Sequence, residues 1–434
     1  MIKTRKSKQN KWWRLARAGS TNTHKPDYSL LIVIFLLVIF GLVAVASASS
    51  VMSYDLTSRL IAEGLMDGDP TNYYFLKSQL INGVLIGVIL FALVTRINYR
   101  FWKKIAPWML VITLVLLIAV FIPGIGFSSG GAARWISVGP LFFQPAELAK
   151  LTFVLYLAAW LDSRGQEVKG FSTGFIPFIA SVIVVAALIL LQPDLGTLLV
   201  ILMAAITMYF VAGAKYSHLA IIGTGGIGFL FLAIKLAPFR LARFAVFLNP
   251  ELDPQGIGFQ INQALLAIGS GGLLGMGLGH SRQKFNFLPE VAGDSIFAVI
   301  AEELGFIRSI LLILLFIFLA YKGYKIAKSA PDNFGRFVAV GITTWLIAQA
   351  FINIAGITSL MPLTGIPLPF VSYGGSALVI ALVSAAILFN ISRYTVQAPV
   401  RNKASKMEKM WGNVRSSIPR KRNVKIETHS IDDE

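Results

Sequence analysis

The 434-residue sequence predicts an all-α, polytopic integral membrane protein with about ten transmembrane helices. Its composition is the first indication: 56% of the residues are hydrophobic and 14% are charged, whereas soluble domains are typically about 45–50% apolar and about 25% charged. The second is that apolar runs of about 20 residues, enough to cross a bilayer as a helix, recur along the chain. The chain has no cysteine, which excludes disulfides and thiolate metal sites.

Each predicted helix is an apolar run between charged or Gly/Pro-containing segments. The ten runs are 28–48, 76–95, 105–125, 146–162, 175–192, 195–213, 218–237, 296–321, 336–356 and 375–392. Only Gln192-Pro193-Asp194 separates the fifth run from the sixth, and proline favours a break there because it lacks a helix donor. The chain therefore divides into a basic tail (1–27), a ten-helix domain (28–393) with a large loop (238–294) between helices 7 and 8, and a second basic tail (394–434).

The formal net charge of +18 comes from 39 Lys and Arg against 21 Asp and Glu. If ten spans alternate, 29 of these 39 basic residues fall on one side of the membrane. The positive-inside rule makes that side cytoplasmic, and it holds both termini. The excess charge is thus mainly a topology signal, and we expect no nucleic-acid partner.

The loops 126–145, 238–294 and 357–373 are then extracytoplasmic, and their length points to function. In the largest loop, the spacing of apolar residues over 259–268 predicts a short amphipathic or re-entrant helix at the membrane interface. A structural lid without substrate contact is the alternative. The sequence has no GxxxxGK[ST] or HExxH motif, which argues against a Walker-type ATPase and a zincin.

Charged residues within or beside apolar runs are functional candidates, because an unpaired charge in hydrocarbon costs several kcal/mol. Glu147 and Lys150 lie three residues apart on one helical face and are expected to pair, either structurally or beside a substrate. Asp194 and Asp294 each stand just before an apolar run. Each is therefore a candidate helix N-cap or a candidate site residue.

Two further acidic residues, Glu302 and Glu303, lie inside the eighth run. Their expected role is structural pairing, with Arg308 as a partner.

Four segments form a distinctive set in their order and spacing. They are GAARWISVGPLFFQPAELAKL (131–151), QPDLGT (192–197), the block 249–305 containing AIGSGG and FLPEVAGD, and NIAGITSLMPLTGIPLPFVSYGGSAL (353–378). Together they resemble the SEDS family (shape, elongation, division and sporulation), over about residues 28–395. The wording of the motifs is closer to FtsW than to RodA. Ser295 departs from the pattern, because the family usually has an aromatic residue after the aspartate.

The resemblance implies a peptidoglycan glycosyltransferase at the outer face of the bacterial cytoplasmic membrane. Such enzymes polymerise lipid II, an undecaprenyl-pyrophosphate-linked disaccharide pentapeptide, into β-1,4 glycan strands. The implied partners are a class B penicillin-binding protein, which is a transpeptidase, and other divisome membrane proteins. Resemblance to FtsW implies a role in septal wall synthesis.

The resemblance also implies roles for individual residues. The aspartate matching Asp294 is essential in the family, and it is expected to act as the general base of an inverting transfer. The candidate substrate-binding residues are Arg134, Trp135, Glu147, Lys150, Asp194, Arg243, Lys284 and Glu290. No cofactor is assigned. Asp294, Glu290 and the substrate phosphates are candidate ligands for Mg²⁺ or Mn²⁺, which prefer oxygen.

Other functions remain open at this point. Ten spans with intramembrane charges would also suit a lipid II flippase, and a RodA-like elongation polymerase would share the chemistry. A scaffold that only recruits the penicillin-binding protein is a further alternative. The position of Asp294 at the end of a long outer loop, and not at mid-membrane, favours the polymerase.

Overall fold

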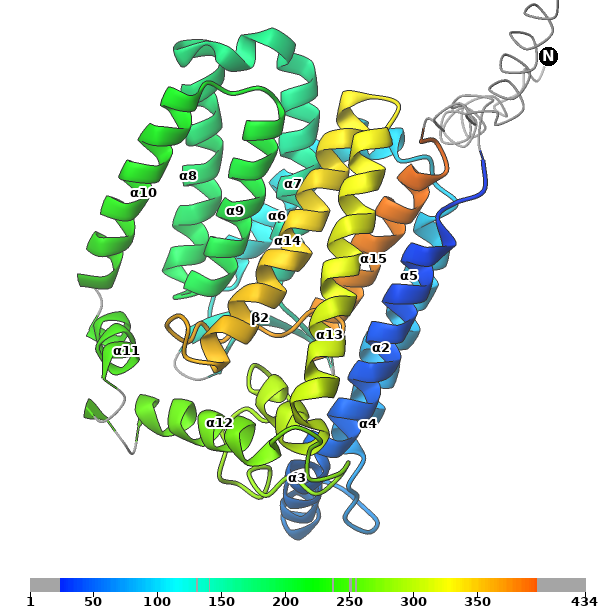
Figure 1. The fold of residues 1–434 in the computed structure, drawn as a ribbon, viewed down its shortest axis with the longest axis vertical. Helices are drawn as coiled ribbons and strands as arrows, with labels where there is room; N and C mark the ends of the chain where they lie inside the picture. Colours follow the sequence, from blue (N-terminus) through cyan, green and yellow to red (C-terminus); the bar gives the residue numbers. More distant parts are fainter. Residues whose placement is uncertain are drawn as a thin grey trace, which may run out of the picture. The chain divides into compact units, whose positions relative to one another are not determined.

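Helices form most of the chain in the computed structural model (Figure 1). The structure describes residues 24–129, 132–139, 141–235, 238–249, 252–253 and 256–395. Most of the two tails predicted at 1–27 and 394–434 therefore lies outside the described residues.

Each of the ten predicted runs is helical. In chain order these helices are α2 (Tyr28–Ala48); the continuous run of α4 (Tyr74–Ser78), the π-helical η1 (Gln79–Leu85) and α5 (Ile86–Val94); α6 (Arg100–Ala119); α7 (Pro145–Arg164); η3 (Phe171–Phe175) continuing into α8 (Ile176–Leu191); α9 (Leu195–Val211); α10 (Tyr216–Lys235); α13 (Ile296–Ser329); α14 (Asn333–Ile357); and α15 (Gly375–Ser392). Four further helical segments connect them: α3 (Ser50–Ala62), η2 (Gly165–Lys169), α11 (Pro238–Leu248) and α12 (Ile257–Gly271).

Seven of these helices in the described chain are long and apolar enough to cross a membrane, namely α2, the α4–α5 run, α6, the η3–α8 run, α13, α14 and α15. The charged residues of α7 lower its hydropathy, and α9 is slightly short at 17 residues. The prediction of a helical membrane protein is confirmed, whereas the number of ten membrane crossings stays a prediction.

The helices differ sharply in how much of their surface is covered. In the most apolar stretch of α14, 83% of the residues are buried, and in that of α15 78%, against 22–33% for α2, the α4–α5 run, α6, the η3–α8 run and α13. The outer helices expose aliphatic and aromatic side chains such as Ile32, Trp108 and Ile183, which suits a lipid surrounding. α14 is therefore the central helix against which the others are positioned.

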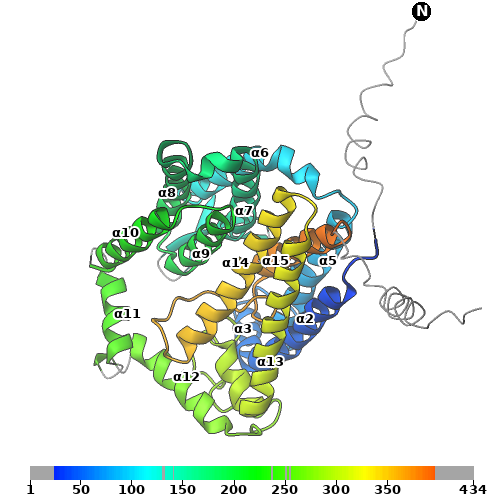
Figure 2. The same cartoon turned by 45° about the horizontal axis from the view of Figure 1, so that its top comes forward.

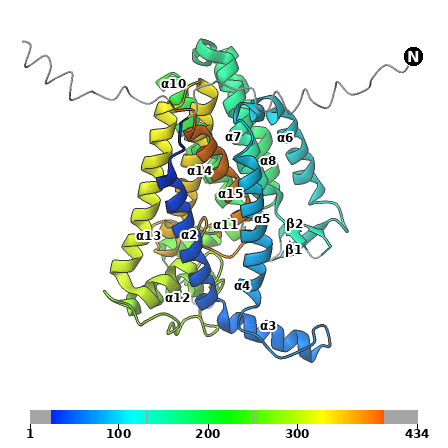
Figure 3. The ribbon, with the colours of Figure 1, turned by 90° about the vertical axis from the view of Figure 1, so that its right-hand side faces the viewer.

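The connecting segments gather at one end of the bundle. Figures 1 and 3 show α3, α11, α12 and a small sheet at the end opposite the connection between α13 and α14. Figure 2 shows α11 and α12 leading from α10 round to α13. The amphipathic helix expected at 259–268 is confirmed as α12. At the other end, the amide of His24 donates to the carbonyl of Arg393, so the first and last parts of the described chain lie side by side.

The segment 126–145, expected to be a loop, instead contains three short strands and the start of α7. The strands are β1 (Gly126–Ser129), β2 (Ala132–Val138) and β3 (Leu141–Phe143), which pair antiparallel in the order β1-β2-β3. Phe127 pairs with Trp135, and Ile136 with Phe143. Strands this short leave almost no alternating pattern in a sequence, and the antiparallel pairing itself supplies their hydrogen bonds.

A kink divides α13 at Gly305, where φ is +78°. The loop over 272–277 fills the break: the amides of Met276 and Gly277 donate to the carbonyls of residues 302 and 303, and the amides of residues 306 and 307 donate to the carbonyls of residues 272 and 273. These bonds satisfy backbone groups that an interrupted helix would otherwise leave unpaired. The kink therefore holds the large loop against the outer part of α13.

Replacing Gly305 with alanine should destabilise the protein. A Cβ at this position would lie 2.2 Å from the amide nitrogen of Gly275, and the positive φ disfavours any side chain. We expect a loss of at least about 1–3 kcal/mol, read as a lower melting temperature in detergent. Gly223→Ala is the matched control, because its Cβ would meet open space and alanine favours helix. Equal melting temperatures for the two variants would contradict this account of the kink.

Candidate active site

Asp294 lies just before α13, in a turn whose backbone carbonyls are held by hydrogen bonds. The three successive carbonyls of residues 292–294 each accept a hydrogen bond from a later part of the chain. The donors are the amide of Tyr373 at 2.8 Å, the hydroxyl of Ser372 at 2.7 Å and the side-chain amide of Asn353 at 2.8 Å. Local sequence places Asp294 at a helix start, but contacts from residues 59 to 81 positions away hold the turn there.

The carboxylate of Asp294 is half-buried and meets two polar side chains. Gln260 of α12 donates from Nε2 to Asp294 Oδ1 at 3.2 Å and to Ser295 Oγ at 3.0 Å. The Ser295 hydroxyl is itself 3.4 Å from Asp294 Oδ1. Ser295, the departure from the family pattern, thus belongs to a small polar cluster with the aspartate.

The surroundings of Asp294 make its carboxylate more basic. Burial and, to a smaller extent, the negative charge of Glu290 raise the pKa of Asp294, whereas the positive charge of Arg243 lowers it; the net effect is a pKa of about 7. A carboxyl group with this pKa is half-ionised near neutral pH, which is the condition under which a general base works best.

Two arginines from different elements stand in this electrostatic environment. Arg243 of α11 donates from Nη1 to the carbonyl of Leu363 at 3.1 Å. Arg134 of β2 donates from Nε to Gln192 and from Nη2 to Pro193, at 3.0 and 2.7 Å. Burial lowers the pKa of Arg243, the charge of Asp294 raises it, and the charge of Arg134 lowers it. Arg243 is therefore close enough to interact electrostatically with both Asp294 and Arg134.

Three further candidate site residues, Asp194, Trp135 and Glu290, have no hydrogen bond to Asp294 among those that the structure shows for the described residues. Asp194 is confirmed as the N-cap of α9, where its two oxygens accept from the amide and the hydroxyl of Thr197 at 2.9 and 2.8 Å. Trp135 lies next to Arg134 on β2 and is half-buried, and Glu290 is exposed.

The extended segment 363–367 joins these parts. It accepts hydrogen bonds from Arg243 at Leu363, from Asn353 at Ile366 and from Gln349 at Pro367. A Cβ on Gly365 would lie 3.7 Å from Asp294 Oδ2, so this residue passes close to the carboxylate. The segment thus brings α11, α14 and the Asp294 turn together.

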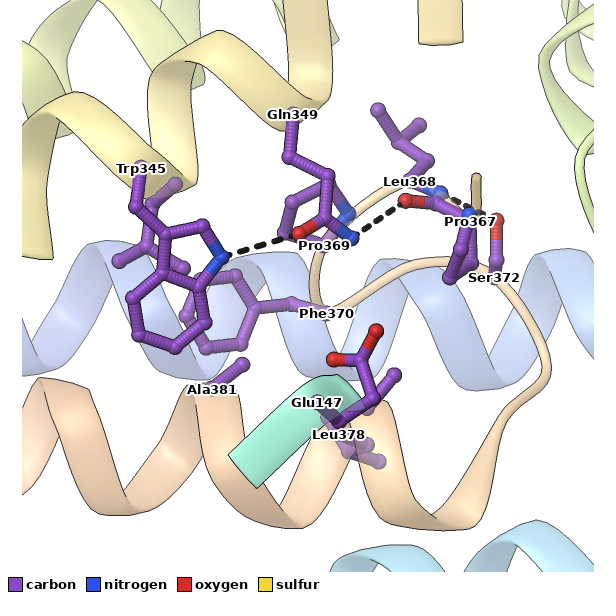
Figure 4. A pocket seen from close by; sticks show the side chains of 12 residues that line it. Glu147, Trp345, Gln349, Pro367, Leu368, Pro369, Phe370, Ser372, Leu378 and Ala381 are labelled. Carbon is purple, nitrogen blue, oxygen red and sulfur yellow. Dashed lines mark hydrogen bonds between the residues drawn. The ribbon is translucent and has the colours of Figure 1, made fainter. Parts of the chain in front are cut away.

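Glu147 and Lys150 of α7 form the expected ion pair, at 2.7 Å and with 3% and 2% of their side chains exposed. Lys150 Nζ also donates to Gln349 Oε1 at 2.7 Å and lies 5.4 Å from the ring centre of Trp345. Glu147 lines a cavity of about 10 Å³ together with residues of α14, the following loop and α15, and Figure 4 shows its carboxylate among these side chains. This volume is close to the minimum that a single water molecule needs.

Lys284 lies in a different buried cluster, at the kink of α13. Its ammonium contacts Glu303 at 3.2 Å, the Gly279 carbonyl at 2.7 Å and Ser47 Oγ at 3.4 Å. Glu302 accepts from the hydroxyl of Ser281 at 2.5 Å and from the amide of residue 282 at 2.9 Å. These bonds attach the large loop to α13.

The expectation that Arg308 pairs with Glu302 and Glu303 was wrong. Arg308 donates instead to the carbonyls of Leu274 and Leu304. The reason is the break at Gly305, because Arg308 lies beyond it and is not carried on one continuous helix with the two glutamates.

No group of three or more His, Cys, Asp or Glu among the described residues is arranged to hold a metal ion. Asp294 and Glu290 by themselves supply only two carboxylates, so a divalent ion at this point would need the substrate phosphates as further ligands.

Sequence reasoning missed Gln260, Gln349 and Asn353. The last two are polar residues four apart in an apolar run, a signal that the rule for intramembrane polar groups would have detected. Gln260 carries no such signal, because a glutamine on an amphipathic helix is ordinarily solvated.

Comparison with known proteins supports a single family over most of the chain. A sequence model described as "Cell cycle protein", for FtsW, RodA and SpoVE, matches residues 27–397. The stage V sporulation protein E of Bacillus subtilis is 43% identical over 87% of this chain and 99% of its own length. The probable peptidoglycan glycosyltransferase FtsW of Trichlorobacter lovleyi is 40% identical over 88% of this chain and 96% of its own.

Solved structures agree. A chain from a peptidoglycan synthase complex that coordinates polymerization and crosslinking superposes with a TM-score of 0.68, at 27% identity over 86% of this chain and 99% of that one. The rod shape determining protein RodA of Thermus thermophilus gives a TM-score of 0.61, at 28% identity over 86% of this chain and 98% of its own. With the motifs, the fold and the relatives in agreement, this chain belongs to the FtsW/RodA/SpoVE (SEDS) family.

Proposed function

We propose that this chain, a peptidoglycan glycosyltransferase, polymerises lipid II with Asp294 as its general base. The observation that carries the proposal is the carboxylate itself. It is half-buried within the electrostatic influence of Arg243, in a turn held through its backbone carbonyls, and its pKa is raised to about 7. Relatives that match this chain over 96% of their own length are named probable peptidoglycan glycosyltransferases.

The proposed step is a direct displacement. Asp294 takes the proton from the acceptor sugar hydroxyl as that oxygen attacks the anomeric carbon of the donor, and the bond to the undecaprenyl-pyrophosphate breaks. No covalent sugar–enzyme intermediate forms, so an α-linked donor gives a β-1,4 strand. A positioned base contributes typically 10²–10⁴-fold.

The departing pyrophosphate gains negative charge, which fixed cations stabilise. We propose Arg243 and Arg134 for this role, because Arg243 interacts electrostatically with Asp294 and Arg134 interacts with Arg243. Trp135, Asp194 and Glu290 are proposed to line the same site. Three further candidates are buried and form ion pairs within the protein, namely Glu147, Lys150 and Lys284. We propose that they affect substrate binding indirectly, by fixing the segments that they contact.

The decisive assay uses the purified protein with labelled lipid II and no transpeptidase activity. Polymerisation predicts glycan strands in the membrane or detergent phase. Lipid II translocation in liposomes without any polymer would instead identify a flippase and contradict the proposal.

The pH dependence of polymerisation follows from the pKa of Asp294. The carboxylate must be deprotonated to act as a base, so kcat/KM should be low below pH 7 and rise as the pH increases through about 7. Glu290→Gln removes a negative charge that raises this pKa, so the rise should move to lower pH. Arg243→Gln removes a positive charge that lowers it, and the rise should move to higher pH. Initial rates over pH 5–9 check this.

The matched control for this series is Glu63→Gln, which removes an exposed carboxylate in the connection after α3. Its pH profile should coincide with that of the unmodified protein. A rise that stays at the same pH in both site variants would show that another group controls the rate.

A class B penicillin-binding protein is the expected crosslinking partner, in keeping with the synthase complex that this chain resembles. We further propose both termini in the cytoplasm, location at the division septum, and contact with other divisome membrane proteins. Fluorescent fusions imaged in dividing cells test the septal location, and a uniform signal along the cell wall would argue for elongation instead.

A further inference from the structure

The central helix α14 carries a row of polar side chains on one face. Trp345, Gln349 and Asn353 follow one another at intervals of four residues, so they lie above one another on the helix. They are only 1%, 3% and 3% exposed. Buried polar groups are costly unless they are hydrogen-bonded, so the partners of this row indicate what it is for.

Gln349 connects α7 to the extended segment 363–367. Its Oε1 accepts from Lys150 Nζ at 2.7 Å and from Trp345 Nε1 at 3.0 Å. Its Nε2 donates to the carbonyl of Pro367 at 2.8 Å, as Figure 4 shows. The side chain can do this only in one orientation, because the ammonium and indole groups both need an acceptor and the carbonyl needs a donor.

Asn353, one turn further along, connects the same segment to the proposed base. Its Nδ2 donates to the backbone carbonyl of Asp294 and to that of Ile366, both at 2.8 Å. Two hydrogens therefore serve two acceptors from parts of the chain that are 72 residues apart. No other amino acid of this size can donate two hydrogen bonds at this place.

The geometry points to a positioning role for Asn353 in the proposed reaction, with Gln349 as its anchor to the buried Glu147–Lys150 ion pair. Asn353 fixes the backbone of Asp294 relative to Ile366, and thus to the segment that also receives Arg243 at Leu363. The Asp294 turn and the segment that Arg243 contacts are in this way held at set positions relative to one helix, α14. This inference rests on the proposed function of Asp294.

Two other bonds hold the turn, from Ser372 and Tyr373, but both donors belong to the loop that follows Phe370. Asn353 alone of the three donors stands on a helix. Because a displacement of about 1 Å at a reacting group can cost about 100-fold in rate, a helix-borne anchor matters for turnover even though it never touches the substrate.

The test separates turnover from binding. Asn353→Leu removes both donors and keeps the number and branching of the side-chain heavy atoms. We expect kcat to fall about tenfold to hundredfold, with the KM for lipid II within about threefold of the original, since substrate-contacting residues are unchanged. The matched control is Thr344→Val on the same helix, 7% exposed, whose hydroxyl is 3.0 Å from Tyr324 OH and away from the site. It should leave kcat and KM unchanged.

A second variant guards against a folding failure. Gln349→Glu retains an acceptor for Lys150 and Trp345 but puts a carboxylate oxygen against the Pro367 carbonyl in place of a donor. It should also lower kcat with little change in KM. Unchanged kcat in a folded Asn353→Leu protein, or a rise in KM with kcat intact, would overturn the positioning role. If Asn353→Leu fails to fold, unchanged kcat in Gln349→Glu would overturn it equally.

Asp294→Asn is measured in parallel, because it tests the proposed base separately from the positioning role of Asn353. Full activity in Asp294→Asn means that the proposed base is wrong, and the positioning role then falls with it. Loss of activity in Asp294→Asn together with normal turnover in Asn353→Leu rejects the positioning role alone.

Discussion

Replacing Asp294 with asparagine is expected to reduce glycan synthesis from purified lipid II by at least about 10²–10⁴-fold, without loss of the fold. Asparagine has nearly the same shape, and its oxygen can still accept the hydrogen bond from Gln260 that Oδ1 receives at 3.2 Å. The backbone contact from Asn353 does not involve the side chain. What the variant lacks is a group that can take a proton from the acceptor hydroxyl.

The stability of the same variant provides an independent check. The folded protein raises the pKa of Asp294 from its ordinary value to about 7, so it binds this proton more tightly than the unfolded chain does. The stabilising contribution of this group is therefore fully present below about pH 4 and is lost as the pH rises through about 7. At pH 8 the asparagine variant should have a melting temperature at least as high as that of the original protein.

The matched control is Asp67→Asn, an exposed aspartate in the connection between α3 and α4. It removes one carboxylate from the part of the chain predicted to be extracytoplasmic and should leave polymerisation unchanged. Polymer yield from Asp294→Asn equal to that of this control would exclude Asp294 as the base.

Lys150→Met is expected to destabilise the protein by about 3–5 kcal/mol, because it leaves the Glu147 carboxylate buried without its cation. The two side chains are 2% and 3% exposed and 2.7 Å apart, so solvent cannot take the place of the ammonium. The change also removes the donor to Gln349 Oε1. Thermal unfolding in detergent, followed by circular dichroism, measures the loss.

The double variant Glu147→Gln/Lys150→Met separates the ion pair from its neighbours. Replacing a whole buried pair by neutral groups is often close to neutral, whereas removing one partner is costly. We therefore expect the double variant to recover most of the melting temperature lost in the single one. A double variant that is as unstable as Lys150→Met would show that the loss comes from Gln349 and the packing around it, and not from an unpaired charge.

Much of the fold could be predicted from the sequence, because the bilayer leaves few alternatives for an apolar run of about 20 residues. Each of the ten runs is helical, and the break at Gln192-Pro193 is where proline placed it. The sheet over 126–143 was missed, since its strands of three to seven residues are too short to show a period. The kink at Gly305 was also missed, because a single glycine in an apolar run does not by itself signal a break.

Some residues of the candidate site could likewise be predicted from the sequence, and others could not. Asp294 was identifiable as a candidate because charged groups beside apolar runs need a reason to be there, whereas Arg243 was named only through the family resemblance. Gln260 was not identifiable, because its role depends on how α12 folds back over the start of α13, and that contact spans 34 residues.

By itself, the sequence determined the membrane class, the helical runs and the family, because hydropathy and motif spacing are local properties of the chain. Only the tertiary structure decided which charges meet. It put Lys284 with Glu303 at the kink, Lys150 with Gln349 on the central helix, and Arg243 in the electrostatic environment of Asp294. Side-chain pairing and the pKa of a buried carboxyl depend on packing between distant segments, which cannot be predicted from a local sequence pattern.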